Sequence, residues 1–236
     1  MSTERKVVII TGASQGIGAA LVRAYRDHHY RVVATSRSIK PSQDPDVVTV
    51  AGDIADPDTA ERVVRTALER FGRIDSLVNN AGIFLSKPFV EFSADEYART
   101  MATNVTGFFH VTQKAAAKML DQGAGHILSI TAAIVDQPIA GVPAALASLS
   151  KGALNAVTRS LATEFASRGV RVNAVAPGII KTPMHAPETH AALAALHPVG
   201  RMGEIQDIVD AVLYLEKAPF VTGEILRVDG GQHAGR

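Results

Sequence analysis

The sequence predicts a doubly wound α/β fold, in which a parallel sheet of about seven strands is covered by helices on both faces. Short β-branched runs alternate with longer amphipathic segments along the 236 residues. The first apolar run, 7–10, passes directly into a glycine-rich turn and then into a helical pattern. Strands that alternate with crossover helices form parallel sheets, so both observations favour this class.

The expected strands are the runs at 7–10, 31–34, 47–50, 77–78, 126–130, 171–175 and 225–228. Helical periodicity is found between them at 17–28, 57–71, 93–120 and 143–167. Asp56 and Ser93 precede helical segments that begin with acidic residues, which is typical of N-caps. No linker or repeat interrupts the alternation, so we expect residues 1–236 to form one Rossmann-type domain.

Composition excludes several functions. The 24 Lys and Arg against 23 Asp and Glu leave a net charge of +1, so no basic surface for nucleic acid is expected. The absence of cysteine excludes disulfides, thiolate metal sites and a cysteine nucleophile, and no metal site is expected. The early apolar run is too short for a secretion signal, and no stretch reaches the ~20 apolar residues of a membrane span. We therefore expect a cytoplasmic protein without a membrane partner.

The glycine-rich turn at 11–18 has the pattern T-G-x-x-x-G-x-G. Glycines allow a tight turn and a close approach of a pyrophosphate to the backbone. The helix that follows directs its first N–H groups and its dipole toward an anion. The turn between a strand and a helix therefore predicts a dinucleotide site, with an ordinary structural turn as the alternative.

Further motifs follow the later strands, and together with the glycine turn they resemble the short-chain dehydrogenase/reductase family over nearly the whole chain. These motifs are Gly52-Asp53-Ile54, Asn79-Asn80-Ala81-Gly82, Asn104, Pro177-Gly178-Ile179-Ile180-Lys181-Thr182 and Val228-Asp229-Gly230-Gly231. They occur in the family's order and at similar intervals. The resemblance implies an NAD(P)-binding domain with oxidoreductase activity.

The resemblance also implies which residues bind the cofactor. They are Gly12, Ser14, Gln15, Gly16, Ile17 and Gly18 at the pyrophosphate, Asp53 and Ile54 at the adenine, Asn79, Ala81 and Gly82 near the adenosine ribose, Lys151 at the nicotinamide ribose, and Pro177, Gly178, Ile180 and Thr182 at the nicotinamide. Taken singly, Asp53 could instead cap a loop, and the Asn79-Asn80 pair could serve only to brace backbone turns.

The second strand bears on the choice of cofactor. An acid at its end would bind the 2′-hydroxyl of NAD, whereas an arginine accommodates the 2′-phosphate of NADP. Here the strand ends in Ser36-Arg37, without an acid. We therefore expect NADP(H) to be preferred over NAD(H), although Gln15 stands where many NADP-using members have a basic residue.

The family's catalytic pattern is incomplete in this chain. The family uses a tyrosine four residues before a lysine on one helix, a serine after the fifth strand and an asparagine on the preceding helix. Lys151 and Asn104 are present, but the tyrosine position is Ala147. The serine position aligns best with Ala132, with Ala133 or Ile134 as alternatives, and none of these has a hydroxyl. Thr131 is the nearest hydroxyl to the serine position.

Three explanations remain open. The proton could come from Asp136, from His185 or from a water held by Lys151 and Asn104. The substrate could need no acid, as when hydride reaches a cationic iminium carbon. The protein could bind NADP(H) without turnover, as a sensor or interaction module. We expect an NADP(H)-dependent oxidoreductase that acts on a small carbonyl, alcohol or imine, with a non-standard proton donor.

The resemblance further implies a homodimer or homotetramer formed through the segments 93–120 and 143–167. The alanine-rich second segment permits close packing of helices. The stretch 183–198, which covers substrates in this family, contains three histidines among alanines and leucines. That stretch matches no pattern that would identify the substrate.

Overall fold

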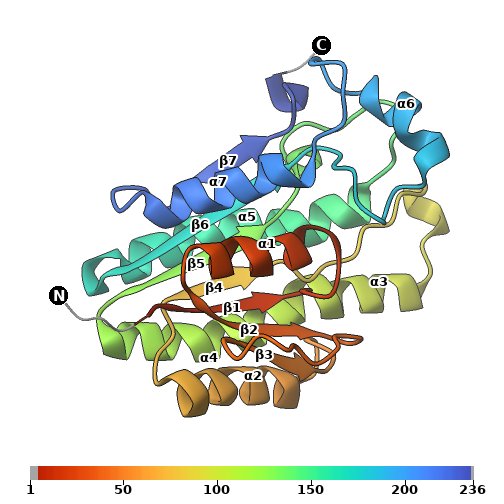
Figure 1. Ribbon diagram of the computed structural model, residues 1–236. Helices are drawn as coiled ribbons and strands as arrows, with labels where there is room; N and C mark the ends of the chain where they lie inside the picture. Colours follow the sequence, from red (N-terminus) through yellow and green to blue (C-terminus); the bar gives the residue numbers. More distant parts are fainter. Residues whose placement is uncertain (1–4, 235–236) are drawn as a thin grey trace.

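Seven parallel strands form one sheet in the computed structural model, in the order β3–β2–β1–β4–β5–β6–β7 (Figure 1). Their bounds are β1 Val7–Thr11, β2 Arg31–Ser36, β3 Val47–Ala51, β4 Ser76–Asn79, β5 Gly125–Ile130, β6 Val170–Pro177 and β7 Ile225–Val228. The structure describes residues 5–234. The strand order runs outward in both directions from β1 and β4, which confirms the predicted doubly wound sheet.

Helices cover both faces of the sheet because successive residues of a strand point to opposite sides. Val7 and Ile9 of β1 pack in one apolar cluster, and Val8 and Ile10 pack in the other. The first cluster lies under α2 Pro57–Phe71, α4 Gly107–Gln122 and α5 Ala145–Phe165, and the second lies under α1 Gly16–Asp27 and α7 Ile205–Lys217 (Figure 1).

The predicted helix at 93–120 contains a local irregularity. It consists of α3 Ala94–Met101 and α4, joined by a π-helical segment over Ala102–Thr106. Such segments insert an extra residue into the helix and occur often at functional sites. Asn104, one of the expected catalytic residues, lies within this segment.

The two predicted N-caps are confirmed. The Asp56 carboxylate accepts a hydrogen bond from the Asp58 N–H at 3.0 Å. Ser93 and Glu96 form a reciprocal capping box at the start of α3. The short α6 His190–Ala194 and the longer α7 are not among the predicted helices.

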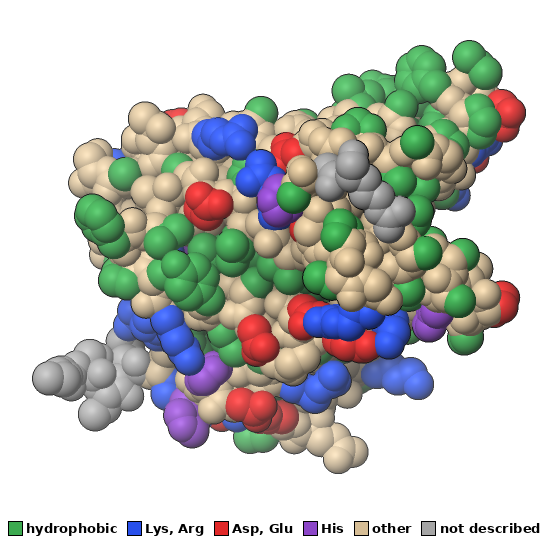
Figure 2. Space-filling view, turned by 90° about the horizontal axis from the view of Figure 1, so that it is seen from above, with side chains coloured by type: hydrophobic (Ala, Val, Ile, Leu, Met, Phe, Trp, Pro, Cys, Tyr) green, Lys and Arg blue, Asp and Glu red, His purple; other side chains and the backbone are tan. Residues whose placement is uncertain are grey.

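Within residues 5–234, no helix has the length and apolar character that crossing a membrane requires. Figure 2 shows acidic and basic side chains interspersed over one face of the molecule. This distribution agrees with the nearly balanced charge of the sequence.

Candidate active site

A cavity of about 760 Å³ opens at the carboxyl ends of the central strands. Its wall includes the glycine turn after β1, the ends of β2 and β5, and the segments that follow β3, β4 and β6. Ligands of doubly wound sheets bind at this edge, where the strand order reverses. The cavity therefore lies where the sequence predicts the dinucleotide.

The glycine turn is packed too closely for side chains. A Cβ on Gly12 would lie 2.8 Å from the Ala81 Cα, and one on Gly18 would lie 2.2 Å from the Gly12 carbonyl oxygen. Gly12 and Gly16 have positive φ angles of 65° and 56°. No side chain caps the start of α1, so N–H groups of its first turn are free to bind an anion.

Asn80 fixes the glycine turn to the end of β4, which is the bracing role given above as the alternative for the Asn79-Asn80 pair. Its amide nitrogen donates to the carbonyl oxygens of Thr11 and Gly12 at 3.0 and 3.1 Å. Asn80 lines the cavity, whereas Asn79 does not. The Asn79 side chain donates to Thr112 of α4 at 2.9 Å, so it braces the sheet from behind.

The adenosine end of the cavity contains polar groups without partners. Thr35 and Ser36 line it, and their hydroxyl oxygens are buried without a hydrogen bond among the described residues. Arg37 is exposed beside them and forms no ion pair within residues 5–234. Asp53 also lines this end, while its carboxylate accepts from the Ala55 N–H at 3.0 Å. Unpaired hydroxyls and a free guanidinium fit a phosphorylated ribose.

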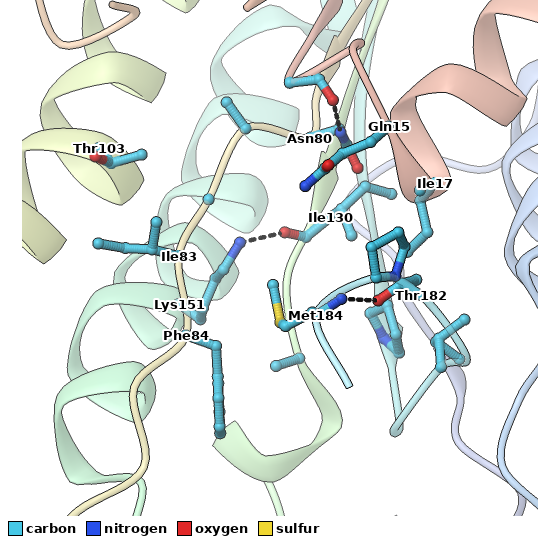
Figure 3. Close-up of a pocket in the computed structure, with 18 of the residues that line it drawn as sticks. Gln15, Ile17, Asn80, Ile83, Phe84, Thr103, Ile130, Lys151, Thr182 and Met184 are labelled. Atoms are coloured by element: carbon cyan, nitrogen blue, oxygen red, sulfur yellow. Dashed lines mark hydrogen bonds between the residues drawn. The ribbon is translucent and has the colours of Figure 1, made fainter. Parts of the chain in front are cut away.

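Lys151 is the charged group at the other end of the cavity. Its ammonium nitrogen donates to the Ile130 carbonyl oxygen at 2.7 Å, its one hydrogen bond within the described residues (Figure 3). Burial lowers the pKa of Lys151 to about 8, because desolvation disfavours the charged form. A Cβ on Gly82 would lie 2.8 Å from this nitrogen, so glycine leaves room for the amine.

Asn104 and Thr131 lie near Lys151, but their hydrogen bonds are already committed. Asn104 is buried outside the cavity, where it exchanges hydrogen bonds with the backbone of Ile83 and donates to the Ser150 hydroxyl. Thr131 lines the cavity, and its hydroxyl donates to the Val175 carbonyl oxygen at 3.3 Å. Both residues therefore support the walls around Lys151.

The two other expected proton donors have different surroundings. Asp136 lies outside the cavity and forms an ion pair with Arg227 at 2.7 Å. His185 lines the cavity, and its pKa is lowered by burial and by the nearby His190. Of these two residues, the structure brings only His185 to the cavity.

Ala147, four residues before Lys151 on α5, lies in a small apolar cluster. It is buried with Ile134 and Ala144, and the partly buried side chains around them include Phe84 and Ala132. No tyrosine is among the described residues that line the cavity. The substrate end thus combines small and apolar side chains with a few polar groups, among them the Lys151 amine.

The remaining expected cofactor residues line the cavity, with the exception of Gly18, which packs beneath the turn. Those that line it are Ser14, Gln15, Ile17, Ile54, Ala81, Gly82, Pro177, Gly178, Ile180 and Thr182. A strand-end cavity with a glycine cradle, unpaired hydroxyls and a buried lysine defines a dinucleotide-dependent oxidoreductase site.

Comparison with known proteins supports this class. A family described as Enoyl-(Acyl carrier protein) reductase matches residues 12–233. A 3alpha-hydroxysteroid dehydrogenase of Mediterraneibacter gnavus is 38% identical over 98% of each chain. The chain belongs to the short-chain dehydrogenase/reductase family.

Solved structures agree with this assignment. The structure described as ElxO with NADP bound has a TM-score of 0.90 and 30% identity, and the match covers 98% of this chain and 100% of the other. A 3-ketoacyl-(acyl-carrier-protein) reductase from Brucella melitensis in complex with NADH has a TM-score of 0.88 and 29% identity, with 98% and 100% coverage. These similar structures therefore include one with the phosphorylated cofactor NADP and one with NADH.

Proposed function

We propose that this protein transfers hydride between NADP(H) and a small carbonyl or alcohol, with Lys151 as the proton donor and acceptor. The observation that carries the proposal is the position of the Lys151 amine, buried at the substrate end of the cavity with one hydrogen bond. The bound nicotinamide would supply the hydride. The residues of the chain supply its seat, the orientation of the substrate and the proton.

The glycine turn and the first turn of α1 would hold the pyrophosphate, since their N–H groups line the cavity without a side-chain cap. Ser36 and Arg37 would bind the 2′-phosphate, which favours NADP(H) over NAD(H). Pro177, Gly178, Ile180 and Thr182 line the far wall, where the nicotinamide would lie. Lys151 would also contact the nicotinamide ribose.

An ammonium group has three N–H donors, and the Ile130 carbonyl oxygen uses one of those of Lys151. A second can donate to a substrate oxygen and stabilise the negative charge that develops there. The lowered pKa of about 8 places the proton near physiological pH, where transfer in either direction is efficient. Reduction moves this proton to the new alcohol, and oxidation returns it to the amine.

The surroundings of Lys151 also favour one substrate class over another. Below pH 8 the amine is mainly cationic, so it repels an iminium carbon and attracts a carbonyl oxygen. Asp136 is unsuited to protonate the substrate, because Arg227 binds its carboxylate outside the cavity. His185 lies on the cavity wall and serves as the comparison residue in the tests below.

We also propose a homodimer or homotetramer that assembles through α4 and α5. Phe109 on α4 and Leu149 on α5 are large apolar side chains, and each is 53% exposed. Exposed apolar groups on long helices favour association. Size-exclusion chromatography with light scattering should give a dimer or tetramer at micromolar concentration, and a monomer would contradict this assignment.

The test of the proposed function is NADPH oxidation in the presence of a panel of ketones, aldehydes and cyclic imines. We expect oxidation with carbonyl substrates, a reduction rate that falls as pH rises above about 8, and loss of that rate in Lys151→Met. His185→Asn should retain most of the rate. A protein that binds NADPH but oxidises it with none of the panel is the binding module instead. Carbonyl reduction that appears only after Ala147→Tyr and Ala132→Ser would also indicate that the unmodified protein is a binding module.

A further inference from the structure

Gln232 lines the cavity from the short helix η6 Gln232–Ala234, an element that carries neither the glycine turn nor Lys151. The residue is only 7% exposed, and its amide oxygen is buried without a hydrogen-bond partner among the described residues. A buried amide oxygen that lacks a partner is costly to the fold, so a ligand that donates a hydrogen bond to it would remove that cost.

The turn that carries Gln232 is held firmly. The Asp229 carboxylate accepts hydrogen bonds from the N–H groups of Gly231 and His233, at 3.0 and 2.8 Å. The His233 ring lies 2.9 Å from the same carboxylate. Gly230 and Gly231 have φ angles of 59° and 88°, which glycine adopts without strain. This rigid turn fixes the Gln232 side chain against the cavity wall.

A contact between two short helices places this turn beside the substrate end of the cavity. The helix η6 packs against the short helix η3 Ala133–Val135, which follows β5. Next to η3, the ion pair of Asp136 with Arg227 ties the same segment to β7. Gln232 is thereby held beside the loop in which the family has its serine.

We propose that Gln232 recognises a second hydrogen-bonding group on the substrate, distinct from the reacting carbonyl. The substrate is then an uncharged ketone or alcohol with an apolar body that bears a hydroxyl group, which can donate a hydrogen bond to the Gln232 amide oxygen. This inference rests on the proposed function and names the substrate class of that site.

The lining of the substrate end supports an uncharged, apolar body. Ile134, Ile139 and Leu193 line the cavity together with Gln232. Arg37 and Asp53, which are charged, lie at the adenosine end. Among the described residues, Lys151 is the one lysine or arginine at this end, and its ammonium is assigned to the reacting oxygen. A carboxylate or phosphate elsewhere on the substrate would find no second such cation, so its desolvation would be poorly compensated.

The test uses cyclic ketones in matched pairs, in which a ring hydroxyl at each position is replaced by a methyl group. The variants are Gln232→Leu and Gln232→Met, with Gln137→Leu as the control, because Gln137 is exposed and lies outside the cavity. For the preferred hydroxyketone we expect kcat/KM to fall roughly 5- to 20-fold in both Gln232 variants. The methyl analogue should change less than about 2-fold, and the Kd for NADPH should be unchanged.

Equal losses for both members of every pair, or no loss in either variant, would overturn the role of Gln232. If none of the ketones causes the wild-type protein to oxidise NADPH, the proposed function fails instead. Gln232 is then tested by ligand-detected NMR of the same pairs on the NADP⁺-loaded protein. Weaker binding of a hydroxyketone to the Gln232 variants than to the wild type supports the inference, and equal binding contradicts it.

Discussion

Two buried polar centres at opposite edges of the sheet differ in how fully they are hydrogen-bonded. At the amino edge, the Glu216 carboxylate at the end of α7 accepts hydrogen bonds from four side chains. The donors are Tyr25 and Tyr30, both at 3.0 Å, Ser76 at 2.8 Å and His126 at 3.0 Å. At the carboxyl edge, the Lys151 amine has one hydrogen-bond partner within residues 5–234, the Ile130 carbonyl oxygen.

The centre at Glu216 is saturated. The Asn173 amide donates to Nε2 of His126 at 3.1 Å, which leaves the His126 proton on Nδ1 for Glu216. Burial lowers the pKa of His126, which favours the neutral ring. Burial acts to raise the pKa of Glu216, but the hydrogen bond from His126, the charge of that ring once it is protonated and the hydrogen bonds from Ser76 and Tyr25 outweigh it and hold this pKa at about 2.

The comparison indicates what each centre does. A buried charge whose lone pairs are all used stabilises one arrangement of the chain. A buried charge with free donors is costly alone and gains by binding a ligand. We infer that the fold is secured at the amino edge, while hydrogen-bonding capacity for ligands is kept at the carboxyl edge. The following predictions test this division.

The largest expected effect is on catalysis at Lys151. Lys151→Met removes the amine but keeps an unbranched side chain, and we expect kcat/KM to fall about 10²–10⁴-fold. The free energy of unfolding should not decrease, because a desolvated ammonium is removed. Steady-state kinetics and urea unfolding measure the two effects. A Lys151→Met protein that unfolds more easily and keeps its activity would show that Lys151 stabilises the fold and does not serve catalysis.

The converse change is at Glu216. Glu216→Ala leaves the buried donors of Tyr25, Ser76 and His126 without an acceptor, so we expect a loss of about 3–5 kcal/mol in the free energy of unfolding. The Kd for NADPH, measured at a temperature where the variant is folded, should be unchanged. A loss of cofactor binding by the folded variant would show that the two edges are not independent.

The pH dependence of stability should come from the same centre. The pKa of Glu216 is about 2 in the folded chain against 4.5 in the unfolded chain, so the unfolded chain binds more protons between these values. The stabilisation is present above pH 4.5 and is lost as pH falls toward 2, by roughly 3 kcal/mol. The lowered pKa of His126 acts in the same direction below pH 6.5. Urea unfolding from pH 7 to 3 should show a smaller decline in Glu216→Gln.

The smallest effect concerns Arg37, a second unpaired cation at the carboxyl edge. Arg37→Ala should weaken NADPH binding about 10- to 100-fold through loss of contacts to the 2′-phosphate, with little change for NADH. The stability should be unaffected, because the side chain is exposed and unpaired within residues 5–234. Fluorescence titration with both cofactors measures this. Equal effects on the two cofactors would place Arg37 outside the phosphate site.

Local signals predicted much of the fold. The β-branched runs gave all seven strands, and Asp56 and Ser93 marked two helix starts, because these features depend on neighbouring residues. The helix α7 also carries a local signal, with apolar Ile208, Val212 and Leu215 on one face. This spacing of i, i+4 and i+7 is typical of an amphipathic helix, so the sequence carries the signal for α7.

The arrangement of the site depends more on contacts between distant segments. The sequence analysis selected Asn79, but Asn80 faces the cavity because adjacent residues at the end of β4 point to opposite sides. The partner of Asp136 is Arg227, 91 residues away, so its ion pair has no local signal. The inward position of Gln232 likewise depends on packing of η6 against η3.

The strand β5 connects the two edges, with His126 near its start and Ile130 at its end. The four residue steps from His126 to Ile130 separate the centres by about 13 Å along the strand. Substitutions around Lys151 can therefore accumulate during evolution without drawing on the interactions that hold the chain folded. A scaffold divided in this way can lose an ancestral acid such as the family's tyrosine and acquire a new substrate while remaining intact.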